Sequence, residues 1–436
     1  MWPYHPDLLA TTVPRYTSYP TAAEFAPLSP TKYAEALGGV HGAISLYVHI
    51  PFCEKICFYC GCNTGKSGKR QRLESYLDAL SCEIDLVSSI LPRDASVRRI
   101  AFGGGSPNAI SPTEFLTLVD RLIACFSIDD PTFSIELDPR TFSQEWAEAI
   151  GSVGIQRASL GVQTFATHCQ VAIGRVQPES LIEHSTDLLR KYGVSSLNFD
   201  LMYGLPHQSQ EDLNDSLQRT LAMGPDRIAL FGYAHVPHLI ARQRVIDGNA
   251  LPGSEQRFAM AQLGHALLTE QGYRSIGFDH FAKPDDPLAL ASVGGTLRRN
   301  FQGFTDDQSP VLIGLGSSAV SSFPQLLAQN EKNSGRYRML AGQSRLTSAF
   351  GITRTEDDRH RGEMIESLLC RGSAEVRRVM NRKLLDALQP FLDLDLATIN
   401  EGLLSITPSG LPYARVIAAL FDTYRPQSVR RFSSAV

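Results

Sequence analysis

Four cysteines are crowded into one short segment of this sequence: Cys53, Cys57, Cys60 and Cys62. Uniform scatter of the eight cysteines would place about 0.2 in a window of ten residues. Thiolates prefer iron–sulfur clusters or zinc to hard cations. A structural zinc site usually needs a second ligand pair, and the sequence has no partner CxxC or CxxH. The spacing C-x3-C-x2-C therefore favours a cluster with three protein ligands and one open iron, and a zinc knuckle is the alternative.

The fourth cysteine of the segment needs a separate interpretation. Cys62 follows Cys60 with one residue between them, and closing two ligands onto one cluster over a single residue is awkward. We expect Cys62 to lie near the cluster without binding it. The other four cysteines are dispersed, and we expect them to fill the core.

Polar residues and glycines occur near the ends of apolar segments that look like strands. The glycines of Gly103–Ser106 would let a ligand approach the backbone closely, although a tight turn would use the same residues. Glu136 lies inside an apolar strand, where an unpaired carboxylate is costly. Its alternative role is a buried ion pair with Arg140. Other polar positions could equally be satisfied core or surface groups.

The elements that must position these residues alternate between strand and helix. Six apolar, β-branched segments predict strands over residues 45–50, 98–104, 132–138, 156–162, 196–204 and 227–233. Periodic apolar residues predict helices between them, over 72–91, 112–126, 144–153, 178–192 and 209–223, with Ser209 as an N-cap. Repeated βα units imply an α/β fold with a parallel sheet, open or closing toward a barrel. Ligands of such folds bind at the carboxyl ends of the strands.

The alternation ends near residue 247. A helix is expected over 254–271, an irregular glycine-rich stretch over 277–318, a helix over 375–392, and then a strand, a turn and a helix. We expect an N-terminal extension (1–40), a βα barrel (41–250), a barrel-associated substrate-side segment (251–335) and a smaller, mainly helical C-terminal domain (336–436).

Composition limits the class of protein. The chain has 436 residues, of which 43% are hydrophobic and 20% charged, as in ordinary globular proteins. A net charge of −4 argues against a surface that binds nucleic acid. The sequence has neither a secretory signal pattern nor an apolar stretch long enough for a membrane span. We therefore expect a cytoplasmic protein, in which thiols stay reduced.

The C-x3-C-x2-C motif after a first strand resembles the radical S-adenosylmethionine (SAM) superfamily. Longer segments resemble oxygen-independent coproporphyrinogen III oxidase over nearly the whole chain: PRYTSYPTAAEF, LYVHIPFC with CGCN, FGGGSP, SIELDPR, SLGVQ, NFDLMYGLPHQ, YAHVP, GFDHFAKPDD, RRNFQGFT and FDTY. The resemblance implies a partial (β/α)6 radical-SAM barrel and a [4Fe-4S] cluster held by Cys53, Cys57 and Cys60. It also implies that the open iron of the cluster binds SAM.

The same resemblance assigns residues to two SAM molecules. Contacts to the first are implied for Tyr47, Gly104, Gly105, Ser106 and Glu136, with Glu136 at the ribose hydroxyls. A second SAM is implied beside Gln163, Arg175 and Asp200, with Tyr59, Ala234 and Val320 in the same pocket. Residues implied to matter for catalysis are Tyr47, His49 and Cys62. The family usually has Phe at Tyr59 and Thr at Ser106.

The reaction implied is the oxidative decarboxylation of two propionates of coproporphyrinogen III, which gives protoporphyrinogen IX for haem synthesis. An unidentified electron donor and acceptor are implied, and we expect a monomer. Arginine binds carboxylates well, and cations in matching motifs are Arg15, Arg140, Lys283, Arg298 and Arg299. Two alternatives are a haem chaperone and a haem-degrading radical SAM methyltransferase. The segments RYTSYPT and HFAKPDD argue against both.

Overall fold

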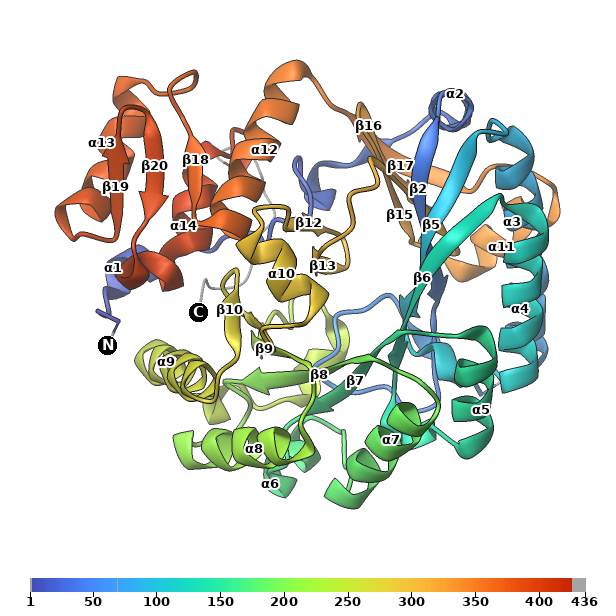
Figure 1. Ribbon diagram of the computed structural model, residues 1–436, viewed down its shortest axis with the longest axis horizontal. Helices are drawn as coiled ribbons and strands as arrows, with labels where there is room; N and C mark the ends of the chain where they lie inside the picture. Colours follow the sequence, from blue (N-terminus) through green and yellow to red (C-terminus); the bar gives the residue numbers. More distant parts are fainter. Residues whose placement is uncertain (1, 69, 426–436) are drawn as a thin grey trace.

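Six parallel strands form the centre of the molecule in a computed structural model that describes residues 2–68 and 70–425. They are β2 (Gly42–Ile50), β5 (Ala95–Gly104), β6 (Ile128–Leu137), β7 (Arg157–Gln163), β8 (Ser196–Tyr203) and β9 (Arg227–Gly232), and their order in the sheet follows the sequence. The sheet curves into the partial (β/α)6 barrel that the sequence predicts (Figure 1). Strand β2 is apolar almost throughout because both of its faces are covered.

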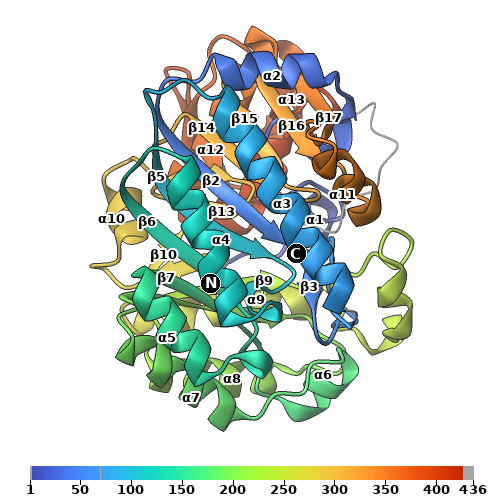
Figure 2. The same ribbon diagram turned by 90° about the vertical axis from the view of Figure 1, so that its right-hand side faces the viewer.

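Helices cover the outer face of this arc (Figure 2). They are α3 (Arg70–Ile90), α4 (Pro112–Cys125), α5 (Gln144–Val153), α7 (Glu179–Lys191) and α8 (Gln210–Met223), with the short α6 (Thr167–Ala172) before α7. Ser209 begins α8 with a capping box, since its side chain accepts from Asp212 N at 3.1 Å. The observed ends of all five predicted barrel helices lie within two residues of the predicted ends, so these helices are confirmed.

The sheet continues beyond the barrel strands on both edges. Strand β14 (Val311–Leu315) pairs in parallel with β2 and leads to antiparallel β15 (Val320–Phe323), β16 (Leu326–Asn330), β17 (Ser348–Thr353) and β1 (Ala26–Pro27). The far edge carries β11 (His280–Ala282) and β10 (Arg274–Ile276). Helices α2 (Pro30–Gly38) and α11 (Ser334–Gly342) pack near the β2 side.

The expectation of an irregular stretch over 277–318 is wrong. That stretch contains β11, α10 (Pro287–Val293), β12 (Arg298–Asn300), β13 (Gly303–Thr305) and β14. Three of these strands have three residues each, which is too short to show a period of two. Strand β14 is buried at all five positions, so its residues do not alternate either.

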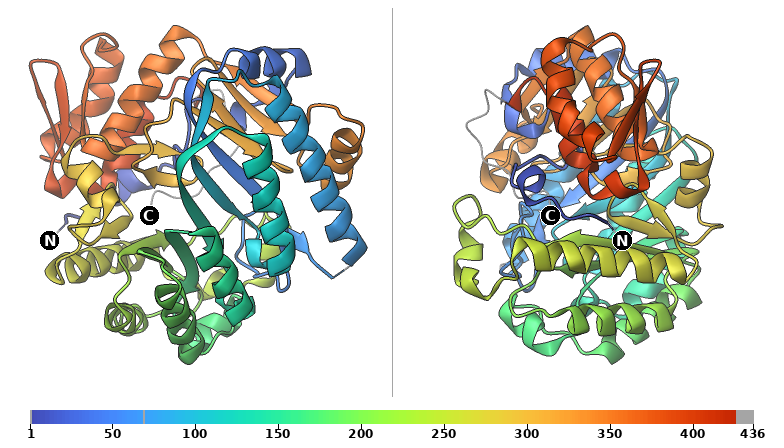
Figure 3. Two further views of the ribbon diagram at one scale, coloured as in Figure 1. Left: turned by 45° about the vertical axis from the view of Figure 1, so that its right-hand side comes forward. Right: turned by 90° about the vertical axis from the view of Figure 1, so that its left-hand side faces the viewer.

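The two ends of the chain share a second hydrophobic core. The C-terminal elements are α12 (Glu356–Arg371), β18 (Ser373–Glu375), α13 (Arg382–Asp393), β19 (Ala397–Asn400), β20 (Leu403–Ile406) and α14 (Ala414–Ala418). N-terminal residues pack into their core, among them Leu9 of α1 (Pro6–Leu9), Tyr16 and Tyr19. Phe258 of α9 (Ser254–Glu270) joins them. Figure 3 shows this unit against one end of the barrel.

The helix expected over 375–392 begins later than predicted. Glu375 pairs with Leu403 in a small sheet, and Asn381 caps α13 by accepting from Leu384 N at 3.0 Å. The boundaries of the expected domains stay a prediction. In the described part of the chain, no helix combines the length and apolarity that crossing a membrane requires.

Candidate active site

The cysteine segment is a loop held at both ends by backbone hydrogen bonds. Strand β3 (Phe52–Cys53) pairs with β4 (Gly65–Lys66), and Ser67 N donates to Cys53 O at 3.0 Å. In the middle of the loop, Phe58 N donates to Ile173 O at 2.9 Å. The loop is therefore fixed against the barrel at the carboxyl ends of the strands.

All four thiols of this loop, the three predicted ligands among them, line one cavity of about 360 Å³. Cys57 is buried, while Cys53 and Cys60 are partly exposed. In the described chain, a group of three potential ligand atoms within 4.8 Å of one another occurs only at His168, Cys169 and Asp212. The loop thiols therefore surround a space wider than a single-ion site, and their number and softness fit an iron–sulfur cluster.

Cys57 faces two guanidinium groups. Arg140 Nη2 and Arg175 Nη1 each donate to Cys57 Sγ at 3.4 Å. Both arginines also pair with Asp138, at 2.6 and 3.3 Å. The predicted alternative of an ion pair between Glu136 and Arg140 is wrong, because Arg140 pairs with Asp138.

Two other loop thiols have shifted pKa values. Burial raises the pKa of Cys53 to about 11. Hydrogen bonding from Cys62 lowers the pKa of Cys60 to about 6, and Cys62 N donates to Cys60 Sγ at 3.4 Å. Cys62 therefore lies against Cys60, and its expected place beside the cluster without binding it stays a prediction.

Glu136 lies between two cavities and contributes to the walls of both. Its Oε2 accepts from Gly104 N at 3.2 Å. A Cβ on Gly103 would come within 2.7 Å of the carboxylate, so this approach needs glycine. Burial, followed by the neighbouring Asp200, raises the pKa of Glu136 to about 7.

The second cavity, of about 830 Å³, is lined by Tyr47, His49, Cys62 and Val320. Tyr47 Oη lies 3.1 Å from His49 Nδ1, and His49 Nε2 lies 3.3 Å from Asn63 O. Burial lowers the pKa of His49 to about 4, so the imidazole is neutral at pH 7.

The cluster-loop cavity brings together most of the residues that the resemblance assigns to a second SAM: Tyr59, Gln163, Arg175, Asp200 and Ala234. Asp200 accepts from Ser159 Oγ at 2.9 Å and from Asn198 Nδ2 at 2.8 Å. Val320 is separated from this group, because it lines the other cavity beside Tyr47.

The residues of the segment Gly103–Ser106 differ in whether they line a cavity or lie in the core. Gly104 lines both cavities and Gly105 lines the cluster-loop cavity. Ser106 is buried outside their walls, and its hydroxyl bonds with Asn108 and accepts from Asp138 N at 3.2 Å. The structure thus places Ser106 in a supporting network behind the turn.

The site contains two residues that the sequence did not predict. Asp138 links Arg140 to Arg175, and its position two residues after Glu136 in the same motif was an available signal. Gln243 donates to Tyr59 O at 2.8 Å and to Ala234 O at 3.1 Å. Its surrounding sequence carries no recognisable signal.

The basic residues that the sequence suggests for substrate binding do not lie together in the structure. Arg15 lines the cluster-loop cavity. Lys283 donates to Gly224 O and pairs with Asp226 away from both cavities. Arg298 pairs with Glu366 and is half exposed. Arg299 Nε donates a hydrogen bond to the backbone oxygen of Arg15.

Cysteines gathered at the carboxyl ends of a partial βα barrel define a radical SAM protein, and the family model described as the Radical SAM superfamily matches residues 47–220. More specifically, the chain belongs to the oxygen-independent coproporphyrinogen III oxidase family. It is 38% identical to the oxidase of that name from Cereibacter sphaeroides, covering 97% of this chain and 96% of the relative. It is 39% identical to the Bradyrhizobium diazoefficiens protein, with 97% of each chain covered.

A solved structure supports the same assignment. Coproporphyrinogen III oxidase from Escherichia coli, described as a radical SAM enzyme, superposes with a TM-score of 0.89 at 35% sequence identity. The match covers 97% of this chain and 99% of that chain. The predicted family, fold class and enzyme class are confirmed, and a [4Fe-4S] cluster and SAM are the characteristic cofactors of the family.

Proposed function

We propose that this enzyme converts two propionate side chains of coproporphyrinogen III to vinyl groups under anaerobic conditions. Each conversion releases one CO₂, transfers one hydrogen atom to a radical and passes one electron to an acceptor. The observation that carries the proposal is a single cavity that is lined by the four loop thiols together with Arg175 and Asp200. The chain's full-length similarity to oxidases of that name supports it over a haem chaperone or a methyltransferase.

Cys53, Cys57 and Cys60 would hold the cluster. When bound, the cluster and SAM supply the one-electron cleavage that produces a 5′-deoxyadenosyl radical. Arg140 and Arg175 donate to Cys57 Sγ, so they orient the sulfur of this ligand. Asp138 fixes both guanidinium groups and balances part of their charge.

The remaining site residues bind and orient the organic ligands. Glu136 would accept hydrogen bonds from ribose hydroxyls, and the backbone of Gly104 and Gly105 would contact the same ligand. Gln163, Arg175 and Asp200 would bind the second SAM, with Tyr59 and Ala234. Tyr47 and His49 form a hydrogen-bonded pair facing the second cavity, where Val320 and Cys62 also lie.

Three further properties belong to the proposal. The enzyme acts as a monomer in the cytoplasm, and it uses a separate electron donor and acceptor.

The test is an anaerobic assay with coproporphyrinogen III, SAM and a reductant. After oxidation of the products, protoporphyrin fluorescence should accumulate, and omission of SAM should abolish it. A protein that bound haem stably and formed no protoporphyrinogen would instead support the chaperone alternative and contradict the proposal.

A further inference from the structure

The sulfur of Cys57 has positively charged hydrogen-bond donors, unlike the sulfurs of the other two proposed cluster ligands. The groups beside those two sulfurs are uncharged. Thr64 Oγ1 lies 3.2 Å from Cys53 Sγ, and Cys62 N donates to Cys60 Sγ at 3.4 Å. Among the thiols that the structure describes, only Cys57 accepts hydrogen bonds from arginine side chains. Direct contact with positive charge is therefore confined to one of the three proposed ligands.

One of these arginines, Arg140, is held against the cysteine loop by several hydrogen bonds. Its Nη2 donates to Cys57 Sγ at 3.4 Å and to Lys55 O at 3.1 Å. The same nitrogen donates to Asp138 Oδ2 at 2.6 Å, and Nε donates to Asp138 Oδ1 at 3.0 Å. Only 6% of the Arg140 side chain is exposed. The guanidinium is therefore directed at the loop rather than at the open part of the cavity.

Asp138 holds this guanidinium in place and is itself fixed. Its backbone N donates to Ser106 Oγ at 3.2 Å and to Asn108 Oδ1 at 3.0 Å. Burial raises the pKa of Asp138, but Arg175 and Arg140 outweigh that effect and hold the pKa below its ordinary value. One carboxylate therefore faces two guanidinium groups, and positive charge remains beside the ligand sulfur.

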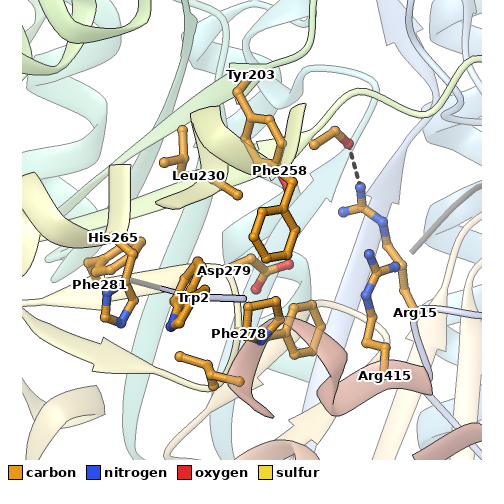
Figure 4. Close-up of a pocket in the computed structure, with 14 residues that line it drawn as sticks. Trp2, Arg15, Tyr203, Leu230, Phe258, His265, Phe278, Asp279, Phe281 and Arg415 are labelled. Atoms are coloured by element: carbon orange, nitrogen blue, oxygen red, sulfur yellow. Dashed lines mark hydrogen bonds between the residues drawn. The ribbon is translucent and has the colours of Figure 1, made fainter. Parts of the chain in front are cut away.

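A second group of arginines in the molecule lacks this relation to a thiol. Figure 4 shows the guanidinium groups of Arg15 and Arg415 on one side of a small pocket that Asp279 also lines. The described residues that line this pocket include no cysteine. A contact between guanidinium and sulfur is thus a particular feature of the cysteine loop, and not a general consequence of placing arginines near the barrel.

The contact has an electrostatic consequence for a cluster bound to this sulfur. Reduction adds one electron, and therefore negative charge, to an iron–sulfur cluster. Hydrogen bonds to a ligand sulfur and nearby positive charge stabilise the reduced form, so they raise the reduction potential. Burial strengthens this effect, because little water screens the charges.

We propose that Arg140, oriented by Asp138, raises the reduction potential of the cluster bound through Cys57 and thereby eases its one-electron reduction. The electron comes from the separate donor of the proposed reaction, and no bond to Arg140 forms or breaks. Arg140 acts through the sulfur of Cys57, so it is a positioning residue. The inference rests on the ligand set of the proposed function and adds the residue that adjusts the potential.

The test is a redox titration of the anaerobically reconstituted holoenzyme with dithionite, without SAM or substrate. Electron paramagnetic resonance measures the reduced cluster. At a fixed ambient potential, Arg140→Gln should lower the ratio of reduced to oxidised cluster about tenfold, which is about 59 mV for one electron. Arg140→Lys keeps the charge and should retain part of the ratio. Arg157→Gln is the matched control, because Arg157 pairs with Asp306 at 2.7 Å and does not line the cluster-loop cavity.

Asp138→Asn separates an electrostatic role from a structural one. The change removes a negative charge, while the amide oxygen can still accept from Arg140, so the ratio of reduced to oxidised cluster should rise. A structural role alone would move both variants in the same direction. The proposal would be overturned by an unchanged potential in Arg140→Gln or by a fall in both variants. Loss of the cluster from Arg140→Gln and Arg140→Lys alike would assign Arg140 to cluster assembly and also overturn it.

Failure of the proposed function has a different signature. Wild-type enzyme that forms no protoporphyrinogen contradicts the reaction, whatever potentials the variants show. Wild-type enzyme that turns over normally, with the same cluster potential in Arg140→Gln, contradicts only the role of Arg140.

Discussion

Cys60 and Cys62 have one residue between them and different expected roles. Cys62 N donates to Cys60 Sγ, an arrangement that orients Cys60 as a ligand while Cys62 lines both cavities. Cys62→Ser should therefore retain the brown cluster and the slow uncoupled cleavage of SAM but lose porphyrinogen conversion. Cys60→Ala should lose all three, because three ligands leave no redundancy. Iron content, visible absorbance and 5′-deoxyadenosine release measure these outcomes.

Cys82→Ala is the control for this comparison, since Cys82 lies on α3 outside the site. A Cys62→Ser protein that fails to assemble its cluster would show that Cys62 is a ligand or fixes the loop.

Glu136 should make the stability of the cofactor-free protein depend on pH. Its folded pKa of about 7 lies above the ordinary value of 4.5. The folded state therefore holds a proton that the unfolded chain releases. The resulting stabilisation is complete below pH 4.5 and is lost as the pH rises through 7. The total is at most about 3 kcal/mol.

Glu136→Gln should remove this dependence, so the variant becomes increasingly more stable than wild type between pH 5 and pH 8. Urea unfolding of the apoprotein across that range measures the difference. The exposed Glu148→Gln on α5 serves as the control. A difference between wild type and Glu136→Gln that stays constant with pH would contradict the raised pKa.

The chemistry of single residues was more predictable than their partners. The thiol spacing and the buried position of Glu136 are local features, and the sequence carried both. The pairing of Arg140 with Asp138 depends on the 3₁₀ turn over Pro139–Thr141, which brings the two side chains together.

At the scale of elements, the end of β5 and the cluster loop must fit closely. A Cβ on Gly105 would lie 2.5 Å from Phe52 O and 2.6 Å from Thr64 Oγ1. Gly105→Ala should therefore displace the loop at a cost of about 1–3 kcal/mol. Reconstituted iron content should fall while the circular dichroism spectrum stays that of the wild type.

Gly38→Ala is the matched control, because a Cβ there meets no atom within 4 Å. Full iron loading of Gly105→Ala would show that the loop can move without losing its ligands.

Some helices and strands could be predicted from the sequence, and others could not. Six barrel strands and their helices have strong apolar patterns, and they form where expected. The extension through β14 depends on parallel pairing with β2, more than 250 residues earlier in the chain. Local sequence does not encode such a pairing, and the glycine in VLIGL obscures the strand. Gly314 is required there because a Cβ would lie 2.7 Å from Val320 O.

At the scale of the whole molecule, the chain ends act as one unit over the barrel. Tyr16 Oη donates to Asp422 Oδ2 at 3.0 Å across 406 residues of sequence, and Tyr19 Oη lies 3.1 Å from Thr423 Oγ1. A C-terminal deletion would therefore also uncover the apolar contacts of the N-terminal segment. A single hydroxyl is the better probe of this junction.

Tyr16→Phe removes the hydroxyl and leaves its buried partner with fewer donors, which costs about 1–3 kcal/mol. The junction of the two chain ends should then loosen, and water should enter more readily during radical chemistry. We expect more than two SAM molecules to be consumed for each protoporphyrinogen formed, against two in the wild type under the proposed reaction. Quantifying 5′-deoxyadenosine and protoporphyrin in the same anaerobic samples gives this ratio.

Tyr192→Phe controls for loss of a phenol, because Tyr192 Oη bonds to Glu148 in an exposed region of the barrel. If Tyr16→Phe lowers stability while the ratio of SAM to product stays at two, the junction only supports the fold. A raised ratio in Tyr16→Phe and an unchanged ratio in Tyr192→Phe would instead mean that closure by the paired chain ends protects the radical reaction.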